Sequence, residues 1–209
     1  MNKGQFITLE GGEGAGKSTQ MTYVEECIKK AGKNVCVTRE PGGTAISEAI
    51  RELLLDHRQT EMHADTELLL MFAARAQHIN ELILPALEKG EWVLCDRFTD
   101  ATYAYQGGGR GISNDHISVL ENWVQGELRP DLTLLLDLPV ETGLSRAGKR
   151  GELDRFEREQ QDFFNRVRQS YLDLAAQHPD RYCIVDASLD IQAVQHQINE
   201  YLAPVLEKG

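Results

Sequence analysis

The sequence has no long hydrophobic run. Its longest uninterrupted apolar stretch, residues 68–74, is seven residues long and ends at Arg75. About 18 apolar residues are needed to cross a membrane, so we expect no membrane segment and no membrane partner. Few residues precede the first apolar stretch at Phe6, and a cleavable export signal is therefore not expected either.

The sequence is also short of paired cysteines and of basic charge. Its four cysteines, Cys27, Cys36, Cys95 and Cys183, are widely spaced and form no CxxC pair, which favours reduced thiols that pack as small hydrophobic side chains. The 22 basic residues are outnumbered by 33 acidic residues, which gives a net charge of −11. This balance argues against a nucleic-acid partner and against attachment to a membrane surface. We expect a cytoplasmic protein.

The composition is that of an ordinary globular chain. Hydrophobic residues make up 41% of the 209 residues and charged residues 26%, close to the averages for such proteins. This composition excludes disordered, collagen-like and low-complexity classes. The length predicts a single domain, residues 1–209, and no repeat or linker divides it.

Short apolar runs alternate with longer segments of helical period, a pattern typical of parallel βαβ units. We therefore expect an α/β fold with a five-stranded parallel sheet flanked by helices. A long helix with a possible kink at Pro85 is predicted over residues 65–88, a loop over the glycine-rich residues 106–111, and a second long helix with Phe156 on its apolar face. The strands are predicted at residues 5–10, 34–38, 91–95, 132–138 and 182–185.

Residues 11–18, GGEGAGKS, match the P-loop pattern GxxxxGK[ST] between a predicted strand and a predicted helix. Backbone N–H groups of such a loop form an anion site at a helix N-terminus, and glycines let the phosphates approach closely. Lys17 would reach the β- and γ-phosphates, and the Ser18 hydroxyl would bind Mg²⁺. The motif indicates a nucleotide site but is silent about an acceptor. The predicted ATP-binding residues are Gly11, Gly12, Glu13, Gly14, Ala15, Gly16, Lys17, Ser18, Thr19 and Arg146.

Charged residues also follow the second and third predicted strands. Ligands of doubly wound sheets bind at the carboxyl ends of the strands, so Arg39, Asp96 and Arg97 should face the phosphates. Asp96 is a candidate ligand of Mg²⁺, although a structural Asp–Arg pair is an alternative. Asp137, which ends the fourth strand, is interpreted as structural.

Two further features have open interpretations. Phe72 and Arg75 are three residues apart and share a helix face, so they could stack and hydrogen-bond a base, or Phe72 could belong to the core. Residues 146–155 are polar, basic and interrupted by glycines, which is typical of a flap over a triphosphate or of a solvated loop.

Taken together, these motifs resemble those of the thymidylate kinases, a family of the P-loop nucleoside-monophosphate kinase superfamily. The resemblance runs from the first strand to the last helix. Beyond the P-loop it rests on Glu13, TREPGGT at 38–44, Phe72 with Arg75, Asp96-Arg97, AYQG at 104–107 and RGELDR at 150–155.

The resemblance implies Mg²⁺-dependent transfer of the γ-phosphoryl group of ATP to dTMP, giving dTDP and ADP. Lys17, Arg97 and Arg150 match the catalytic positions, and Ser18 and Asp96 the metal site. Arg39 and Arg97 match the residues that hold the acceptor phosphate, Phe72 the ring that stacks on thymine, and Arg75 its hydrogen-bonding partner. The implied dTMP-binding residues are Glu13, Arg39, Phe72, Arg75, Arg97, Thr102, Tyr105 and Gln106.

Members of this family differ in the source of a catalytic arginine. Some carry it in the P-loop, where this sequence has Gly14, and others in the flap, as Arg150 is here. This chain therefore resembles the flap-arginine, bacterial-type variant. Phe98 stands where many relatives have tyrosine, so a hydroxyl group there cannot be essential. Relatives are homodimers, and a helix over residues 68–87 could supply the shared face.

Three other functions remain open at this point. A deoxynucleoside kinase would need a carboxylate base such as Glu10 or Glu40 to deprotonate a sugar hydroxyl. A GTP-dependent switch should carry an Asn-Lys-x-Asp motif, but the only Asn-Lys is Asn2-Lys3, ahead of the P-loop. A non-catalytic nucleotide-binding module would not explain Lys17, Ser18 and Asp96 together.

Overall fold

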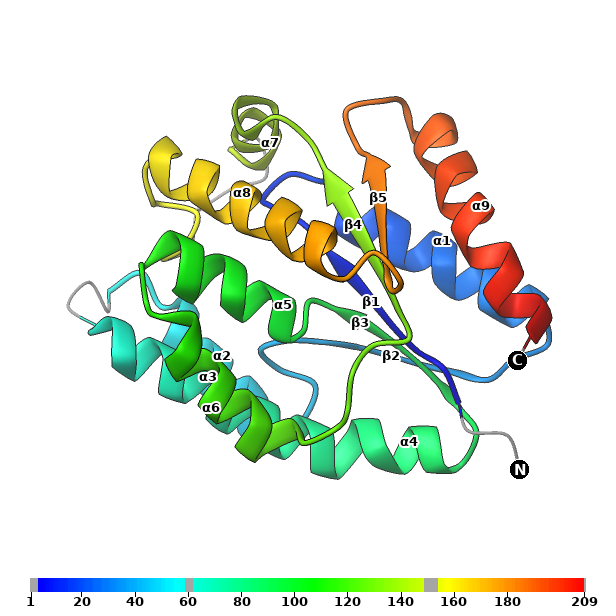
Figure 1. Ribbon diagram of the computed structural model, residues 1–209, viewed down its shortest axis with the longest axis horizontal. Helices are drawn as coiled ribbons and strands as arrows, with labels where there is room; N and C mark the ends of the chain where they lie inside the picture. Colours follow the sequence, from blue (N-terminus) through cyan, green and yellow to red (C-terminus); the bar gives the residue numbers. More distant parts are fainter. Residues whose placement is uncertain (1–3, 59–61, 149–153, 209) are drawn as a thin grey trace.

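The computed structural model describes residues 4–58, 62–148 and 154–208. Five parallel strands form one sheet in the order β2-β3-β1-β4-β5, and helices cover both of its faces (Figure 1). The expected α/β fold and all five predicted strands are confirmed. The strands are β1 (Phe6–Glu10), β2 (Val35–Arg39), β3 (Trp92–Asp96), β4 (Leu132–Asp137) and β5 (Tyr182–Asp186).

The helices form the two outer layers. Helices α1 and α9 pack on one face, against side chains of β1, β4 and β5. The other face is covered by α8 and its neighbours and by the helical path that precedes β3. Within the described residues, none of the helices combines the length and apolar character that crossing a bilayer requires. The α-helices are α1 (Lys17–Lys30), α2 (Ala45–Leu55), α3 (Ala64–His78), α4 (Leu84–Glu88), α5 (Thr99–Thr102), α6 (Asn114–Gln125), α7 (Val140–Ala147), α8 (Gln161–Gln177) and α9 (Ile191–Lys208).

The inner strands β1 and β4 are buried along nearly their whole length, which explains their almost continuous apolar sequences. Their two buried hydroxyl groups satisfy each other, since the Oγ1 atoms of Thr8 and Thr133 lie 3.0 Å apart. The carboxyl ends of β1, β3 and β4 therefore meet on one edge of a rigid sheet, and the P-loop begins there.

The long helix predicted over residues 65–88 is present but not uniform. A π-helical segment η1 (Ile79–Ile83) joins α3 to α4, and the Leu84 N–H donates to Ile79 O five residues earlier. Pro85 has no N–H to continue the α-helical pattern, and the wider turn immediately precedes it. In place of the kink expected at Pro85, the helix therefore changes its pitch just before the proline.

The loop predicted over residues 106–111 is wrong. These residues largely belong to a π-helical segment η2 (Tyr103–Gly109), which continues α5 and packs along α8. A Cβ on Gly108 would lie 2.8 Å from the Ser170 Cβ, and one on Gly109 would overlap the Phe163 ring. Gly108 and Gly109 therefore permit close packing of two helices, whereas Gly111, with φ 79°, lies just after the segment.

The second long helix is also shorter than predicted. Helix α8 begins at Gln161, and Phe156 lies in a turn that precedes it. The Phe156 ring is nevertheless buried among the aromatic residues of α8 and η2, so its apolar character was correctly interpreted and its helical setting was not.

Candidate active site

The P-loop connects β1 to α1 at the carboxyl edge of the sheet. Gly16 adopts a left-handed conformation with φ 87° as the N-cap of α1, and the Thr19 N–H donates to Gly16 O at 3.1 Å. The buried Lys17 side chain folds back over the loop, where Nζ donates to Gly11 O at 3.2 Å and Gly12 O at 3.4 Å. Burial lowers the pKa of Lys17, and the charge of Arg97 lowers it further.

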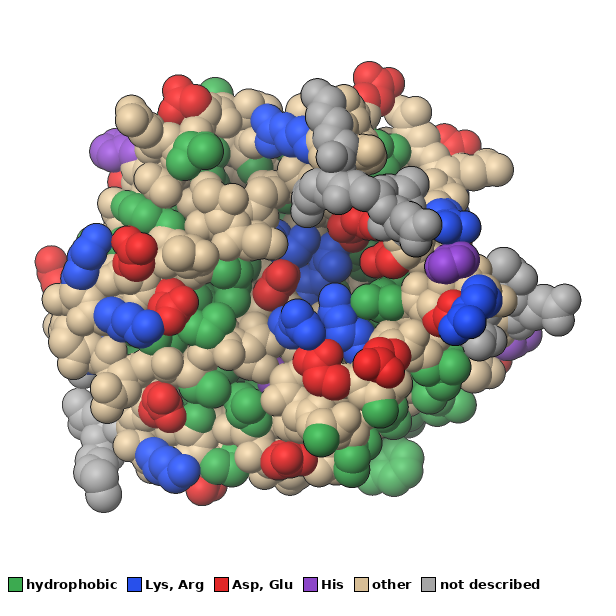
Figure 2. Space-filling model, turned by 180° about the vertical axis from the view of Figure 1, so that it is seen from behind, with side chains coloured by type: hydrophobic (Ala, Val, Ile, Leu, Met, Phe, Trp, Pro, Cys, Tyr) green, Lys and Arg blue, Asp and Glu red, His purple; other side chains and the backbone are tan. Residues whose placement is uncertain are grey.

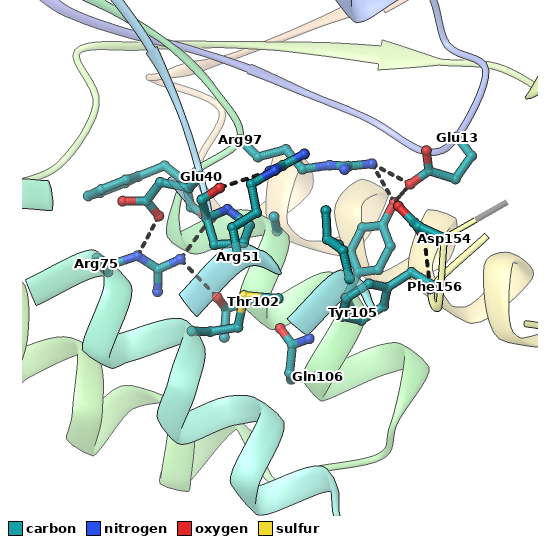
Figure 3. A pocket seen from close by; sticks show the side chains of 15 residues that line it. Glu13, Glu40, Arg51, Arg75, Arg97, Thr102, Tyr105, Gln106, Asp154 and Phe156 are labelled. Atoms are coloured by element: carbon teal, nitrogen blue, oxygen red, sulfur yellow. Dashed lines mark hydrogen bonds and ion pairs between the residues drawn. The ribbon is translucent and has the colours of Figure 1, made fainter. Parts of the chain in front are cut away.

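A cavity opens beside the P-loop, between the sheet edge and helices α2, α3 and α5 (Figure 3). Three guanidinium groups line it, and Figure 2 shows Lys and Arg side chains gathered in a hollow near the centre of one face of the molecule. We call this space the acceptor cavity. Its lining residues are Glu13, Glu40, Pro41, Arg51, Leu55, Met71, Arg75, Arg97, Phe98, Ala101, Thr102, Tyr105, Gln106, Asp154 and Phe156.

Arg97 lies at the end of this cavity nearest the P-loop, in a strained conformation. It is a non-glycine residue with φ 68°, a conformation that costs about 1 kcal/mol and is often kept at functional sites. Its Nη2 atom donates to Glu13 Oε1 at 2.5 Å and to the Tyr105 hydroxyl at 2.7 Å. Burial alone would raise the pKa of Glu13, but the charges of Arg97 and Lys17 hold it at about 2. Glu13 is therefore a fixed anion between two cations.

Arg75 lies at the other end of the acceptor cavity and has one uncommitted donor. Its Nε donates to Glu40 Oε2 at 2.8 Å, and Nη2 donates to Thr102 Oγ1 at 2.9 Å and to Phe98 O at 3.2 Å. Its Nη1 is buried and has no hydrogen-bond partner among the described residues. A buried donor without a partner is costly, so a ligand that supplied an acceptor there would be favoured.

The prediction that the Phe72 ring faces the ligand is wrong. Its ring packs in the core with Leu68 and Ile117, whereas Met71, one residue earlier on α3, lines the acceptor cavity. Neighbouring residues of a helix face directions about 100° apart, and sequence spacing alone did not resolve which one faces the ligand. Phe72 instead supports Arg75, whose guanidinium carbon lies 4.8 Å from the Phe72 ring centroid.

Arg39 does not line the acceptor cavity. Its half-exposed side chain donates to Glu48 Oε2 at 2.9 Å, and it lines a neighbouring hollow with Ser18 and Asp96. Arg51 of α2, which sequence reasoning missed, lines the acceptor cavity instead and donates to Pro41 O at 2.8 Å. Burial lowers the pKa of Arg51, and the nearby charge of Arg39 adds to the effect. An anion in the cavity would relieve this repulsion.

Ser18 and Asp96, the two predicted metal ligands, lie at the same hollow. Both line the hollow next to Arg39, and Asp96 Oδ1 is buried without a hydrogen-bond partner among the described residues. A hydroxyl and a carboxylate oxygen fit a hard cation such as Mg²⁺, which keeps several water or phosphate ligands. No group of three or more His, Cys, Asp or Glu side chains suited to a metal occurs in the described part of the chain.

A separate groove also borders the P-loop. It is lined by Gly14, Ser18 and Thr19 together with Arg146, Ala187 and residues 189–192. Arg146 lies in the last turn of α7 and donates from Nη1 to Ala187 O at 3.0 Å, so the expected flap begins after this residue. The segment after β5 was not predicted as part of the site. Arg150 and the rest of residues 149–153 of the expected flap lie outside the described residues.

Asp137, which we interpret from the sequence as structural, forms an ion pair with Arg168. Its two carboxylate oxygens accept from Nε and Nη2 of Arg168 at 2.7 Å and 2.8 Å. The four cysteines are also unpaired, as the sequence predicted.

Comparisons with known proteins agree with this geometry. The family model described as thymidylate kinase matches residues 9–198. The chain is 60% identical over 205 residues to a thymidylate kinase of Pseudomonas entomophila, covering 98% of each chain. It is 61% identical over 204 residues to one of Ectopseudomonas mendocina, covering 98% of this chain and 97% of that one. The crystal structure of thymidylate kinase from Ehrlichia chaffeensis superposes with a TM-score of 0.79 at 31% identity, covering 96% of this chain and 99% of that one.

The chain belongs to the thymidylate kinase family. This membership makes it a nucleoside-monophosphate kinase, a phosphotransferase. The structure also explains why the P-loop has glycine at position 14. A Cβ on Gly14 would overlap Gly143 O of α7, and φ is 69°. An arginine at position 14 is therefore excluded, and the catalytic role of a flap arginine stays a prediction.

Proposed function

We propose that the chain transfers the γ-phosphoryl group of ATP to dTMP in a Mg²⁺-dependent reaction that yields dTDP and ADP. The observation that carries this proposal is the acceptor cavity itself. Next to the P-loop lysine it holds the guanidinium groups of Arg51 and Arg97, and at its far end the free Nη1 donor of Arg75. An acceptor with a phosphate at one end and a carbonyl-bearing base at the other matches both features.

The acceptor phosphate needs no catalytic base. The second pKa of a phosphate monoester is about 6, so it is largely dianionic at pH 7. Phosphoryl transfer through a loose transition state then depends mainly on positioning and on charge stabilisation. We assign the holding of the acceptor phosphate to Arg97 and Arg51, and the neutralisation of the transferred group to Lys17. Arg39 and Arg150 keep the roles that the resemblance implies, as predictions.

The remaining cavity residues suit a deoxyribonucleoside. Arg75 would donate to a carbonyl of the base, with Thr102 and Gln106 beside it. The hydroxyl group of Tyr105 donates to Glu13 Oε1 at 2.8 Å and accepts from Arg97. This pinned ring would crowd a ribose 2′-hydroxyl, and Glu13 would lie near the acceptor sugar. Met71 and Phe98 supply apolar walls in place of Phe72.

The groove on the donor side suits ATP, with the P-loop residues on its phosphates and Arg146 near its nucleoside. Mg²⁺ would be held by Ser18 and Asp96, where it would neutralise charge on the β- and γ-phosphates. Residues of the P-loop line both hollows, Glu13 on the acceptor side and Gly14, Ser18 and Thr19 on the donor side, which supports a meeting of donor and acceptor at this loop.

A deoxynucleoside kinase is the second candidate, and the contacts of its two candidate bases disfavour it. Glu10 is fully buried and accepts from Phe98 N at 2.7 Å and from the Tyr171 hydroxyl at 2.8 Å. Glu40 is occupied by Arg75 and by His78 Nδ1 at 2.9 Å. Neither carboxylate is free to deprotonate a sugar hydroxyl.

We also propose that the chain forms a homodimer in the cytoplasm. Helices α3 and α6 pack together and expose large apolar side chains, since Leu69 is 56%, Val119 65% and Trp123 82% exposed. Side chains of this kind on adjoining helices suit a two-fold contact with a second copy of the chain. Light scattering should give twice the chain mass, and Trp123→Glu should give a monomer. A monomeric wild-type protein would contradict this part.

A coupled ADP-release assay with ATP and Mg²⁺ tests the proposed reaction, with dTMP and thymidine compared as acceptors. Turnover with dTMP alone is expected. Turnover with thymidine alone would indicate a nucleoside kinase. Absence of turnover with both compounds would refute the proposal that dTMP is the acceptor.

A further inference from the structure

Two polar side chains that line the acceptor cavity, those of Arg75 and Gln106, each donate a hydrogen bond to a buried carboxylate. Glu40 holds Arg75, as described above. Glu67, in the first turn of α3, holds Gln106, whose Nε2 atom donates to Glu67 Oε1 at 2.8 Å. Glu67 is fully buried, and no step of the reaction described above uses it.

The other partners of Glu67 are cations. Arg155 Nη1 lies 2.7 Å and Arg110 Nη2 lies 3.2 Å from Glu67 Oε2. These two ion pairs favour the charged carboxylate, whose oxygens can only accept hydrogen bonds. The end of the Gln106 carboxamide that faces Glu67 is therefore its NH₂ group.

This contact fixes what Gln106 offers to a ligand. With the NH₂ group turned to Glu67, the carboxamide oxygen is left for the cavity, where Figure 3 shows the side chain rising next to Thr102. No described residue donates a hydrogen bond to this oxygen. Arg75 lines the same cavity, and its buried Nη1 is likewise without a partner among the described residues. The cavity thus offers one donor and one acceptor to a base.

We propose that Glu67 is a positioning residue that determines base specificity by fixing the orientation of the Gln106 carboxamide. The inference rests on the proposed function, because it takes the ligand to be a nucleoside monophosphate. A 4-keto pyrimidine presents a carbonyl oxygen next to an imide N–H, which complements the Arg75 donor and the Gln106 acceptor. A 4-amino pyrimidine presents an amino group next to a bare ring nitrogen, which opposes both.

The other contacts of the two cations make this role testable. Arg155 also donates from Nε to Leu54 O at 2.8 Å, and Arg110 also pairs with Glu159. Both guanidiniums therefore keep a partner when the Glu67 charge is removed. Gln106 Nε2 has no second hydrogen-bond acceptor among the described residues. Glu67→Gln therefore frees the Gln106 carboxamide to turn.

The test compares kcat/KM for dTMP and for dCMP in the wild type, Glu67→Gln and Glu159→Gln. In Glu67→Gln the carboxamide of Gln106 can turn its NH₂ group to the cavity, so the preference for dTMP over dCMP should fall about tenfold or more. In Glu159→Gln, which removes only the other partner of Arg110, the preference should stay within about twofold of the wild type. A preference in Glu67→Gln that matches the wild type, with both substrates slowed equally, would overturn the proposal.

A reciprocal variant covers the case in which Glu67→Gln does not fold. The double variant Glu67→Gln/Gln106→Glu keeps one carboxylate and one amide at the same two positions, and position 106 again offers only acceptors. It should prefer dTMP over dCMP to within about threefold of the wild type, because a carboxylate can accept from the imide N–H. A double variant without that preference would overturn the proposal. The wild-type assay separates the two claims, because a wild type that does not use dTMP refutes the proposed function itself.

Discussion

Arg75 Nε lies 2.8 Å from Glu40 Oε2, and both side chains are almost completely buried. The second oxygen of Glu40 accepts from His78 Nδ1, and His78 Nε2 lies 2.7 Å from Thr38 Oγ1. A chain of buried contacts therefore runs from the end of β2 to the Arg75 guanidinium, which lines the acceptor cavity. Because each member is held by the next, Arg75 presents its free donor in one orientation before any ligand arrives.

Glu40→Gln tests this pre-organisation. Loss of the carboxylate should raise KM for dTMP about tenfold or more, because Arg75 loses its charge-assisted hydrogen bond and its fixed orientation. The KM for ATP should stay unchanged, since the donor groove is separate. Steady-state kinetics with both substrates, next to the exposed α2 variant Glu52→Gln, provides the check. Equal changes in both KM values would contradict the account.

Arg51→Ala tests the phosphate end of the acceptor cavity. A hydrogen bond to a charged group contributes about 1.5–3 kcal/mol, so kcat/KM for dTMP should fall about 10- to 100-fold. Arg58→Ala is a matched control, because Arg58 follows the same helix but is 80% exposed and pairs with Asp56. If both variants behave alike, Arg51 does not hold the acceptor phosphate.

Arg150→Ala tests the catalytic arginine that the resemblance implies. This residue lies outside the described residues, so the expectation rests on the motif at 150–155 and on the exclusion of an arginine at Gly14. By analogy with arginines supplied in related phosphoryl transfers, kcat should fall at least about 10²-fold. A near-wild-type kcat would remove that role.

Glu10→Gln should change how stability depends on pH. Burial raises the pKa of Glu10 from its ordinary value to about 8, and the charge of Asp100 adds to this. Between about pH 5 and pH 8 the unfolded chain therefore loses a proton that the folded protein keeps. The free energy of unfolding then falls with rising pH, by at most about 1.4 kcal/mol per pH unit from this group.

Urea unfolding at several pH values measures this effect. Relative to the wild type, Glu10→Gln should become progressively more stable from pH 5 to pH 8, because it has no proton to lose. The exposed variant Glu26→Gln should follow the wild-type curve. Parallel curves for Glu10→Gln and the wild type would show that Glu10 is ionised in the folded protein.

Local sequence was sufficient for the parts of the site that a single segment builds. The P-loop is one turn between a strand and a helix, and Asp96 and Arg97 follow directly from the end of β3. The fold followed from the alternation of strands and helices. In each case the residues that determine the geometry are neighbours in the chain.

The missed residues depend on contacts across the fold. Glu40 and Glu67 matter because Arg75 and Gln106, more than 30 positions further along, pack against them. Phe72 was named because aromatic character is visible in a sequence, whereas the rotation of α3 about its axis, which turns Met71 to the cavity, is not. The glycines of η2 were misinterpreted for a similar reason, since the α8 side chains that require them are about 55–60 residues away.

Gly109→Ala tests this account of η2. A methyl group at this position would overlap the buried Phe163 ring, which should destabilise the protein by about 1–3 kcal/mol. Gly148→Ala is a matched control, because its nearest neighbour would be Leu144 O at 3.5 Å and its φ is −60°. Urea midpoints measure both variants. An unchanged midpoint for Gly109→Ala would contradict this account, because it would show that η2 can move away from the Phe163 ring without loss of stability.

The destination of the γ-phosphoryl group tests the central claim most directly. The protein is incubated with [γ-³²P]ATP, Mg²⁺ and dTMP, and the labelled products are separated by thin-layer chromatography. The account predicts that the label appears in dTDP, and that Arg97→Ala suppresses this product. Label found only in inorganic phosphate, or transferred to thymidine but not to dTMP, would contradict it.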